Sequence, residues 1–158
     1  MNPEEIKKYK ETIEEFLEKM TMDDFSITEI NLGETKKDST ETLVVNIELK
    51  EPQILIGQNG QTLLELQRLL KIILNKKTQN NFYLDLDINH YKNKKIDYLK
   101  YLAKDSANQV ALTHQEKVLP VMSSYERRII HSELADRQDV VTLSQGDEFN
   151  RYITISPR

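Results

Sequence analysis

Residues 54–64 of the chain read Ile54-Leu55-Ile56-Gly57-Gln58-Asn59-Gly60-Gln61-Thr62-Leu63-Leu64. The two glycines of this segment lie three residues apart, between a short apolar run and the start of a strongly periodic helix. Glycine turns the backbone through positive φ at no steric cost, and it lets another backbone approach closely. A helix beginning at Gln61 presents unpaired N–H groups and the positive end of its dipole, which suits a phosphate. On spacing alone, the pattern also fits a helix C-cap glycine followed by a tight turn.

Periodicity predicts the elements on both sides of this segment. Upstream, residues 3–20 carry apolar side chains at helical spacing, and residues 25–32 and 42–49 read as an antiparallel hairpin around a polar turn at 33–40. Residues 52–56 predict a short helical segment. Downstream, residues 61–77 predict a long helix and residues 82–88 a further strand. The predicted order is α-β-β-α-loop-α-β.

The composition changes after Asn89. Residues 90–95 form a polar, basic joint, and a helix is predicted over 93–114. A short apolar segment at 117–122 precedes a second helix over 124–135. Two strands, 140–143 and 152–155, are predicted around a turn at 145–147.

The second of these helices carries a candidate binding face. Arg127 and His131 are four residues apart and share one face of a helix, with Ser124 and Arg128 flanking it. A guanidinium can hold a phosphate with two hydrogen bonds, and an imidazole can donate to phosphate or stack on a base. The alternative is a solvated helix face on which Glu126 or Glu133 pairs with the arginines. For a lone Arg-x-x-x-His, that alternative is favoured.

Composition limits the classes of protein. The 158 residues suit one or two small domains, and 38% hydrophobic residues can form a core. No apolar run approaches the length of a membrane-spanning helix, and no signal-peptide hydrophobic region follows Met1. The absence of cysteine excludes disulfides and agrees with a cytoplasmic location. A net charge of −4 argues mildly against nucleic-acid binding, although a local basic face can still bind.

The glycine segment resembles the loop of a KH domain, a single-strand nucleic-acid module with a GXXG clamp. The predicted order of elements matches the type II arrangement of that domain. In the family, the loop lies against the sugar-phosphate backbone of about four nucleotides. The resemblance implies a type II KH domain over residues 1–90, with an RNA-binding loop formed by Ile56, Gly57, Gln58, Asn59 and Gly60.

Tyr125-Glu-Arg-Arg-Ile-Ile-His131 resembles the core of the single-strand-binding domain named for its Arg-x-x-x-His spacing. Because it follows a type II KH segment, the chain resembles the bacterial Jag (SpoIIIJ-associated) family, which joins these two modules. The resemblance implies a small α/β Arg-x-x-x-His (R-3-H) domain over residues 91–158. Its RNA contacts would come from Arg127 and His131, with Arg128, Arg151 and the flanking Ser124 beside them.

Three departures from the family matter. The GXXG loop holds the neutral Gln58 and Asn59 where relatives usually carry a basic residue, which predicts weaker binding at physiological salt. Val121 and Ser124 replace prolines, which predicts a looser entry to the helix. The family's separate N-terminal Jag domain is not expected, since the first KH-type helix begins almost at Met1.

The sequence therefore predicts an α+β protein that binds single-stranded RNA, or single-stranded DNA, without catalysis, metal or cofactor. By resemblance, it is an RNA chaperone or post-transcriptional regulator linked to cell shape. A small KH-domain protein or a second copy of this chain is its expected partner, and it is not inserted in a membrane. The alternative is a protein-interaction module with decayed RNA affinity. Candidate stacking platforms are among Tyr83, Tyr91, Tyr98 and Tyr101, of which Tyr98 and Tyr101 are expected to pack.

Overall fold

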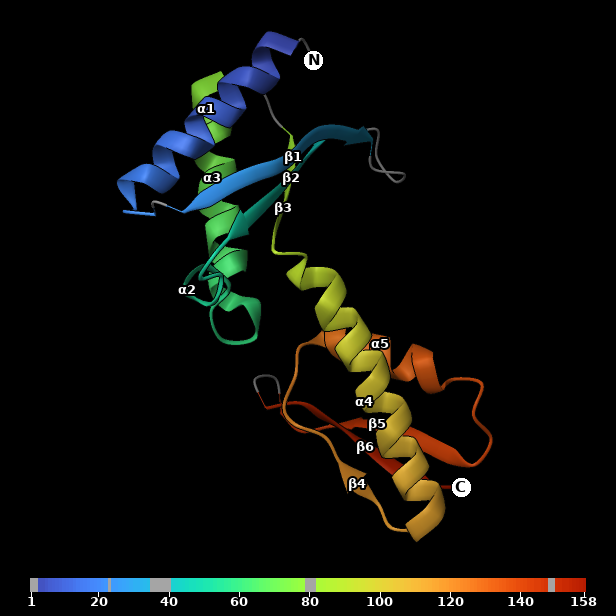
Figure 1. Cartoon of the computed structure of the whole chain (residues 1–158). Helices are drawn as coiled ribbons and strands as arrows, with labels where there is room; N and C mark the ends of the chain where they lie inside the picture. Colours follow the sequence, from blue (N-terminus) through green and yellow to red (C-terminus); the bar gives the residue numbers. More distant parts are fainter. Residues whose placement is uncertain (1–2, 23, 35–40, 79–81, 148–149) are drawn as a thin grey trace. The chain divides into compact units, whose positions relative to one another are not determined.

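The computed structural model describes residues 3–22, 24–34, 41–78, 82–147 and 150–158. The chain divides into two compact units, Met1–Lys92 and Asn93–Arg158 (Figure 1). Residues 35–40 of the predicted hairpin turn lie outside the described part of the chain.

The first unit has the predicted order of elements. It contains α1 (Pro3–Lys19), β1 (Phe25–Glu34), β2 (Glu41–Leu49), α2 (Gln53–Ile56), a 3₁₀ turn η1 (Gln58–Gly60), α3 (Gln61–Thr78) and β3 (Tyr83–Ile88). The strands form one sheet in the order β1-β2-β3. β1 is antiparallel to β2, as the hairpin predicts, with a register shift between Ile27 and Glu29, and β3 is parallel to β2.

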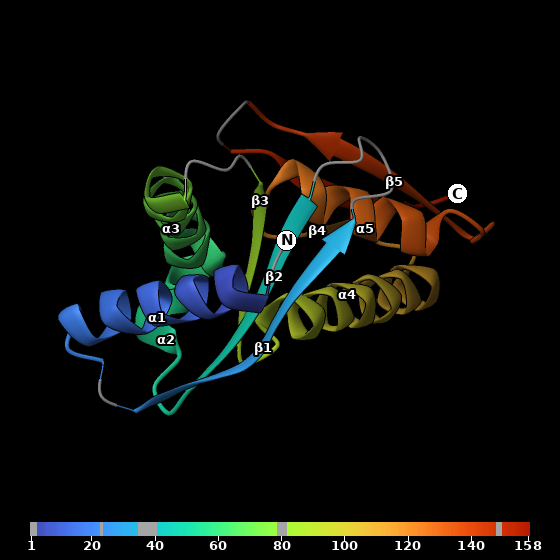
Figure 2. The ribbon, with the colours of Figure 1, turned by 90° about the horizontal axis from the view of Figure 1, so that it is seen from above.

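Helices α1 and α3 lie on one face of this sheet (Figures 1 and 2). Their apolar stripes recur at helical spacing and meet the alternating apolar residues of β2 and β3. Tyr9 of α1 packs edge-on against Phe82, with ring centroids 5.1 Å apart. The fully buried side chains of this core include Tyr9, Ile13, Leu17, Leu43, Val45, Ile47, Leu70, Leu74, Leu86 and Ile88.

The parallel pairing of β2 and β3 positions the glycine loop. Parallel strands cannot be joined by a tight hairpin, so the chain crosses over through α2, η1 and α3. Helix α3 then runs back along the sheet before β3 begins (Figure 1). The N-terminus of α3 and the C-terminal end of β3 therefore lie at the same end of the unit.

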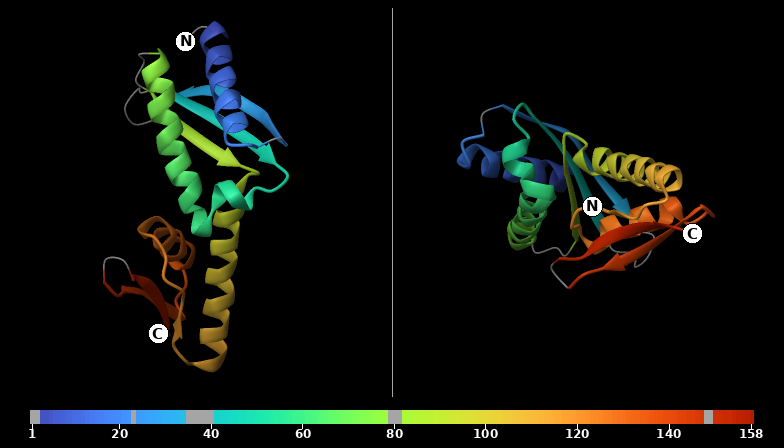
Figure 3. Two further views of the ribbon diagram at one scale, coloured as in Figure 1. Left: turned by 90° about the vertical axis from the view of Figure 1, so that its left-hand side faces the viewer. Right: turned by 90° about the horizontal axis from the view of Figure 1, so that it is seen from below.

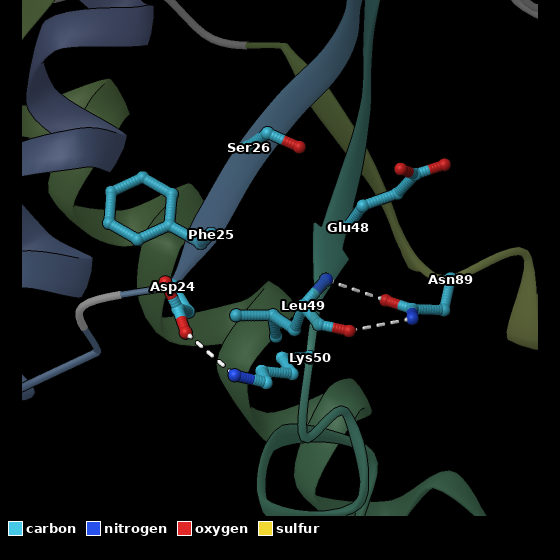
Figure 4. Close-up of a pocket in the computed structure, with 7 residues that line it drawn as sticks. All are labelled: Asp24, Phe25, Ser26, Glu48, Leu49, Lys50 and Asn89. Carbon is cyan, nitrogen blue, oxygen red and sulfur yellow. Dashed lines mark hydrogen bonds and ion pairs between the residues drawn. The ribbon is translucent and has the colours of Figure 1, made fainter.

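The residue after β3, Asn89, bonds to β2 through its side chain. Its Oδ1 accepts from the Leu49 N–H and its Nδ2 donates to the Leu49 carbonyl, both at 2.8 Å (Figure 4). These two bonds continue the β2–β3 pairing while the backbone turns away, because Asn89 and His90 both have positive φ, at 49° and 55°. Asparagine tolerates this conformation better than most residues.

Helix α4 (Tyr91–Thr113) begins two residues before the predicted start at residue 93, which corrects the extent of the predicted polar joint. The first turn of a helix needs partners for its free N–H groups. Here Asp87 Oδ1 accepts from the Lys92 N–H at 3.2 Å and from the Ile88 N–H at 2.9 Å. A side chain four residues before the helix thus supplies the cap, which local composition did not indicate.

The second unit contains the rest of α4, β4 (Lys117–Val118), α5 (Ser124–Leu134), β5 (Val140–Gln145) and β6 (Tyr152–Pro157). Its sheet has the order β4-β6-β5 with antiparallel neighbours, and β4 lies in the segment predicted only as apolar. Helices α4 and α5 lie on the same side of the sheet (Figures 2 and 3). Their core comprises Leu99, Ala103, Ala107, Val110, Leu119, Ile130, Leu134, Val140, Ile153 and Ile155. The chain is thus a mixed α and β protein.

No helix in the described part of the chain is both long and apolar enough to cross a membrane.

Candidate nucleic-acid interface

Backbone conformation makes both loop glycines necessary. Gly57 has φ 68° and ψ −175°, a combination that essentially only glycine adopts. A Cβ at Gly57 would lie 1.9 Å from Thr62 Oγ1. Gly60 has φ 82°, and a Cβ there would lie 2.7 Å from Cε1 of Tyr91. Both positions combine a left-handed backbone with a close neighbour, so neither accepts a side chain without rearrangement.

The loop presents its central residues to solvent. Gln58 and Asn59 are exposed, Ile56 is half-buried, and the buried Leu55 anchors α2 in the core. Asn59 has φ 53°, so the chain reverses direction within η1. The five predicted loop residues thus form one tight turn between α2 and α3, and two of them project neutral amide side chains outward.

The nearby Lys92 is already engaged. Its ammonium forms an ion pair with Asp85 and donates to Gln67 Oε1 at 3.1 Å. The charge of Lys92 is therefore shared with a carboxylate. The polar groups that the loop itself offers to solvent are backbone groups and the neutral side chains of Gln58 and Asn59.

A capping box fixes the start of α5. The Glu126 N–H donates to Ser123 Oγ at 3.3 Å, and Glu126 Oε2 accepts from the Ser123 N–H at 2.7 Å. This reciprocal pair satisfies two of the free donors at the helix start. The helix entry is thus held by a capping box.

Arg127 and His131 of α5 both form hydrogen bonds with side chains of strand β5. Arg127 Nη1 donates to Ser144 Oγ at 2.6 Å, and His131 Nδ1 lies 2.7 Å from Thr142 Oγ1. The two partners are two residues apart, so they share one face of β5. The helical spacing of four therefore meets the strand spacing of two, and both side chains are held half-buried with fixed orientations.

The remaining predicted contacts lie around this pair. Ser124 and Arg128 are exposed on α5, and Arg151 is half-buried just before β6. The Met122 N–H donates to the Arg151 carbonyl at 3.0 Å, which places Arg151 beside the segment that leads into α5. The Nε atoms of Arg127 and Arg151 are buried without a hydrogen-bond partner among the described residues.

The acidic residues of α5 do not neutralise its arginines. Glu126 pairs with Lys95 at 3.1 Å, and Glu133 pairs with Lys104 at 2.8 Å, both lysines belonging to α4. The alternative in which these carboxylates pair with the arginines is therefore wrong. Within the described residues, neither Arg127 nor Arg128 forms an ion pair, so both charges are available to an anionic ligand.

His131 is predominantly neutral near pH 7. Burial lowers the pKa of its imidazole, and repulsion by the Arg127 guanidinium lowers that pKa further. A neutral imidazole bound to Thr142 at Nδ1 can still stack on a base or hydrogen-bond through its other nitrogen. Arg127 and Arg128 therefore supply the positive charge of this face, and His131 supplies a planar polar group.

We predict that the contribution of Glu126 to stability depends on pH. Burial raises the pKa of this carboxyl, but hydrogen bonds from Ser123 and Lys95 outweigh burial and hold the pKa below its ordinary value. Because the folded pKa is lowered, the ionised group stabilises the fold above pH about 4.5 and loses that effect as pH falls through the folded pKa. Glu126→Gln should lower the free energy of unfolding by about 1 kcal/mol at pH 7.

Urea unfolding followed through the NMR signal of the buried Ile130 amide measures this difference at pH 7 and pH 3. The deficit of the variant should shrink at pH 3. Glu116→Gln serves as a control that changes the same charge on an exposed residue. A deficit that stays constant with pH would show that packing, not charge, is involved.

Sequence reasoning missed the hydrogen-bond partners of Arg127 and His131 and misplaced two tyrosines. Thr142 and Ser144 are polar residues alternating along β5, and that alternation was the available signal. Tyr98 and Tyr101, expected to pack, are 55% and 69% exposed. Their positions on α4 face away from the stripe that begins at Leu99.

Comparison with known proteins places these features in a family. The model of the R-3-H domain matches residues 97–157. RNA-binding protein KhpB of Clostridium symbiosum is 36% identical over 155 residues, covering 94% of this chain and 68% of the relative. The chain belongs to the KhpB family. This finding confirms the resemblance to the Jag family, of which KhpB is a member.

The chain matches other KhpB proteins over a smaller part of their length. KhpB of Bacillus subtilis is 33% identical over 124 residues, which cover 77% of this chain and 60% of the relative. KhpB of Lactiplantibacillus plantarum is 32% identical over 114 residues, covering 72% of this chain and 35% of that protein. The residues 97–157 that match the R-3-H model include Arg127, His131, Arg128 and Arg151.

Proposed function

We propose that this KhpB-family chain binds single-stranded RNA through two modules. The first is a type II KH domain over residues 1–90, and the second is the Arg-x-x-x-His domain over residues 91–158. Support for the KH assignment comes from the order α-β-β-α-loop-α-β and from the two glycines at positive φ. The names of its relatives, RNA-binding protein KhpB, support RNA as the ligand.

One observation carries this proposal furthest. Lysines of α4 take up both α5 carboxylates, and Arg127 is held by a neutral hydroxyl. A protein with a net charge of −4 thus keeps a locally positive face. Phosphate contacts dominate the affinity of nucleic-acid binders, and a local face suffices for them. Arg127, Arg128, Arg151, Ser124 and His131 form this contact, and residues 56–60 form the loop contact.

Two weak contacts on one strand reinforce each other. Once one module holds the RNA, the second binds at a high effective concentration, so neither needs high affinity alone. This compensates for the neutral Gln58 and Asn59. The chain acts as an RNA chaperone or post-transcriptional regulator in the cytoplasm, without catalysis, and pairs with a small KH-domain protein or a second copy of itself.

Binding of a mixed-sequence single-stranded RNA between about 50 and 200 mM salt tests the proposal. Each phosphate neutralised on a single strand contributes about 0.7 to the slope of log affinity against log salt. Three arginine contacts predict a slope of about −2. A DNA strand of the same sequence shows whether the 2′-hydroxyl matters. Absence of salt-dependent binding to either strand would exclude the proposal.

That result would favour the protein-interaction alternative. Leu69 and Ile72 are 47% and 65% exposed, and they lie three residues apart on one face of α3. An apolar pair on a helix surface suits contact with another protein. Sedimentation of the chain alone, with Ile72→Lys as the variant, measures self-association.

A further inference from the structure

Tyr91 is the neighbour that, together with the positive φ of Gly60, excludes a side chain from the second glycine position of the loop. Its ring edge faces the Cα of Gly60, so that a Cβ there would lie 2.7 Å from Cε1, 3.1 Å from the hydroxyl oxygen and 3.3 Å from Cζ. All three atoms belong to the hydroxyl end of the ring. The tip of the tyrosine, rather than its base, therefore touches the loop.

Three features of the first unit fix the position of the Tyr91 ring. It is half-buried and packs against the core of the first unit. Tyr91 is the first residue of α4, and Asp87 caps that helix through the Lys92 N–H. Asn89 fixes the preceding residues through its two bonds to Leu49. The hydroxyl group thus has a defined place beside the loop.

Within the described residues, the Tyr91 hydroxyl has no hydrogen-bond partner. Its oxygen is not one of the buried polar atoms that lack a partner, so it is accessible to solvent or to a ligand. A phenol oxygen can donate one hydrogen bond, and a phosphate oxygen is a strong acceptor. The neighbouring loop residues Gln58 and Asn59 carry no charge. Because the Tyr91 side chain is already fixed beside Gly60, a hydrogen bond from its hydroxyl to a ligand at the loop would cost little side-chain conformational entropy.

From these contacts we infer that Tyr91 is an RNA-binding residue of the loop site, whose hydroxyl donates to the RNA backbone held beside Gly60. This inference rests on the proposed function. It differs from base stacking on an aromatic face, because here the ring packs against protein and only its tip is offered to the ligand. The residue also connects the loop to the first turn of α4.

Tyr91→Phe isolates the hydroxyl, since the ring and its packing remain. We expect RNA affinity to fall about threefold to tenfold, the range of a single hydrogen bond. The slope of affinity against salt should not change, because a neutral donor releases no counterion. Tyr101→Phe is the matched control, since Tyr101 lies on the same helix and is 69% exposed. It should bind as the wild type does.

A second pair of variants tests the contact without RNA. Gly60→Ala should destabilise the wild type more than it destabilises Tyr91→Ala, because the clash with the ring disappears and only the backbone strain at φ 82° remains. Thermal unfolding of the four proteins measures this coupling. Additive effects would show that the ring does not press on Gly60, which overturns the placement on which the inference depends.

The outcomes separate the inference from the proposed function. If the wild type fails to bind RNA, the proposed function fails and the inference with it. If the wild type binds and Tyr91→Phe binds equally well, the function stands and the role of the hydroxyl is overturned. Weaker binding by Tyr91→Phe with an unchanged salt slope supports the inference.

Discussion

Gly57→Ala should weaken RNA binding by more than tenfold and lower the free energy of unfolding by about 1–3 kcal/mol, the range for a strongly strained backbone. The added Cβ would lie 1.9 Å from Thr62 Oγ1 and 3.0 Å from the Thr62 backbone nitrogen. An alanine backbone is also strained at φ 68° combined with ψ −175°. The loop can relieve both conflicts only by changing the direction of its N–H groups, which the proposed phosphate contact needs.

The measurements are RNA titration and urea unfolding of the same samples. Leu70→Ala is the control, because it removes a fully buried side chain of α3 and costs about 2–5 kcal/mol without touching the loop. Under conditions in which both variants are folded, only Gly57→Ala should bind poorly. Normal affinity of folded Gly57→Ala would contradict the role of the loop.

The double variant Arg127→Ala, His131→Ala should weaken RNA binding about tenfold or more at about 0.1 M salt, since a hydrogen bond to a charged group contributes about 1.5–3 kcal/mol. The salt slope should become shallower by about 0.7, the share of one phosphate contact. Only Arg127 contributes to this change near pH 7, because burial and the neighbouring guanidinium lower the pKa of His131.

Arg137→Ala is the matched control. It removes the same charge near the end of α5, but this guanidinium already pairs with Asp139 and donates to Asn108 at 2.6 Å. Its removal should leave the salt slope unchanged. Equal effects of the two arginine substitutions would show that net charge, rather than the α5 face, governs binding.

The lowered pKa of His131 also predicts that RNA binding depends on pH. A bound phosphate favours the protonated imidazole, so RNA binding should take up a proton and strengthen as pH falls below about 6.5. In the free protein, the lowered pKa has the opposite consequence: the neutral form is the stabilising one, and stability declines over the same range. Both effects should disappear in His131→Ala. Titration of RNA at pH 7.5 and pH 5.8 measures the first effect.

Local sequence patterns were sufficient for the elements and for the pairing of residues along one element. Helical spacing placed Arg127 and His131 on one face of α5, and strand alternation identified β1, β2 and β3. The glycine spacing located the loop. These predictions succeeded because they depend on side-chain directions within one helix or strand, which the sequence fixes through periods of 3.6 and 2.

The start of α4 shows where such reasoning ends. Residues 90–95 are polar and basic, and they read as a joint. The helix predicted from residue 93 begins at Tyr91, because the side chain of Asp87 caps the first turn, and Asn89 completes the pairing of β2. A cap supplied from the preceding strand depends on where that strand ends, which local composition does not contain.

The amino-acid sequence by itself determined the two glycines, the Arg-x-x-x-His face and the order of the elements around them. Only the tertiary structure decided which charges remain available. The carboxylates of Glu126 and Glu133 form ion pairs with lysines of α4. Arg127 and His131 form hydrogen bonds with hydroxyl groups of β5. The Tyr91 ring lies against Gly60. These contacts join residues far apart in the chain, and they arise because packing the helices on the sheets brings those residues together.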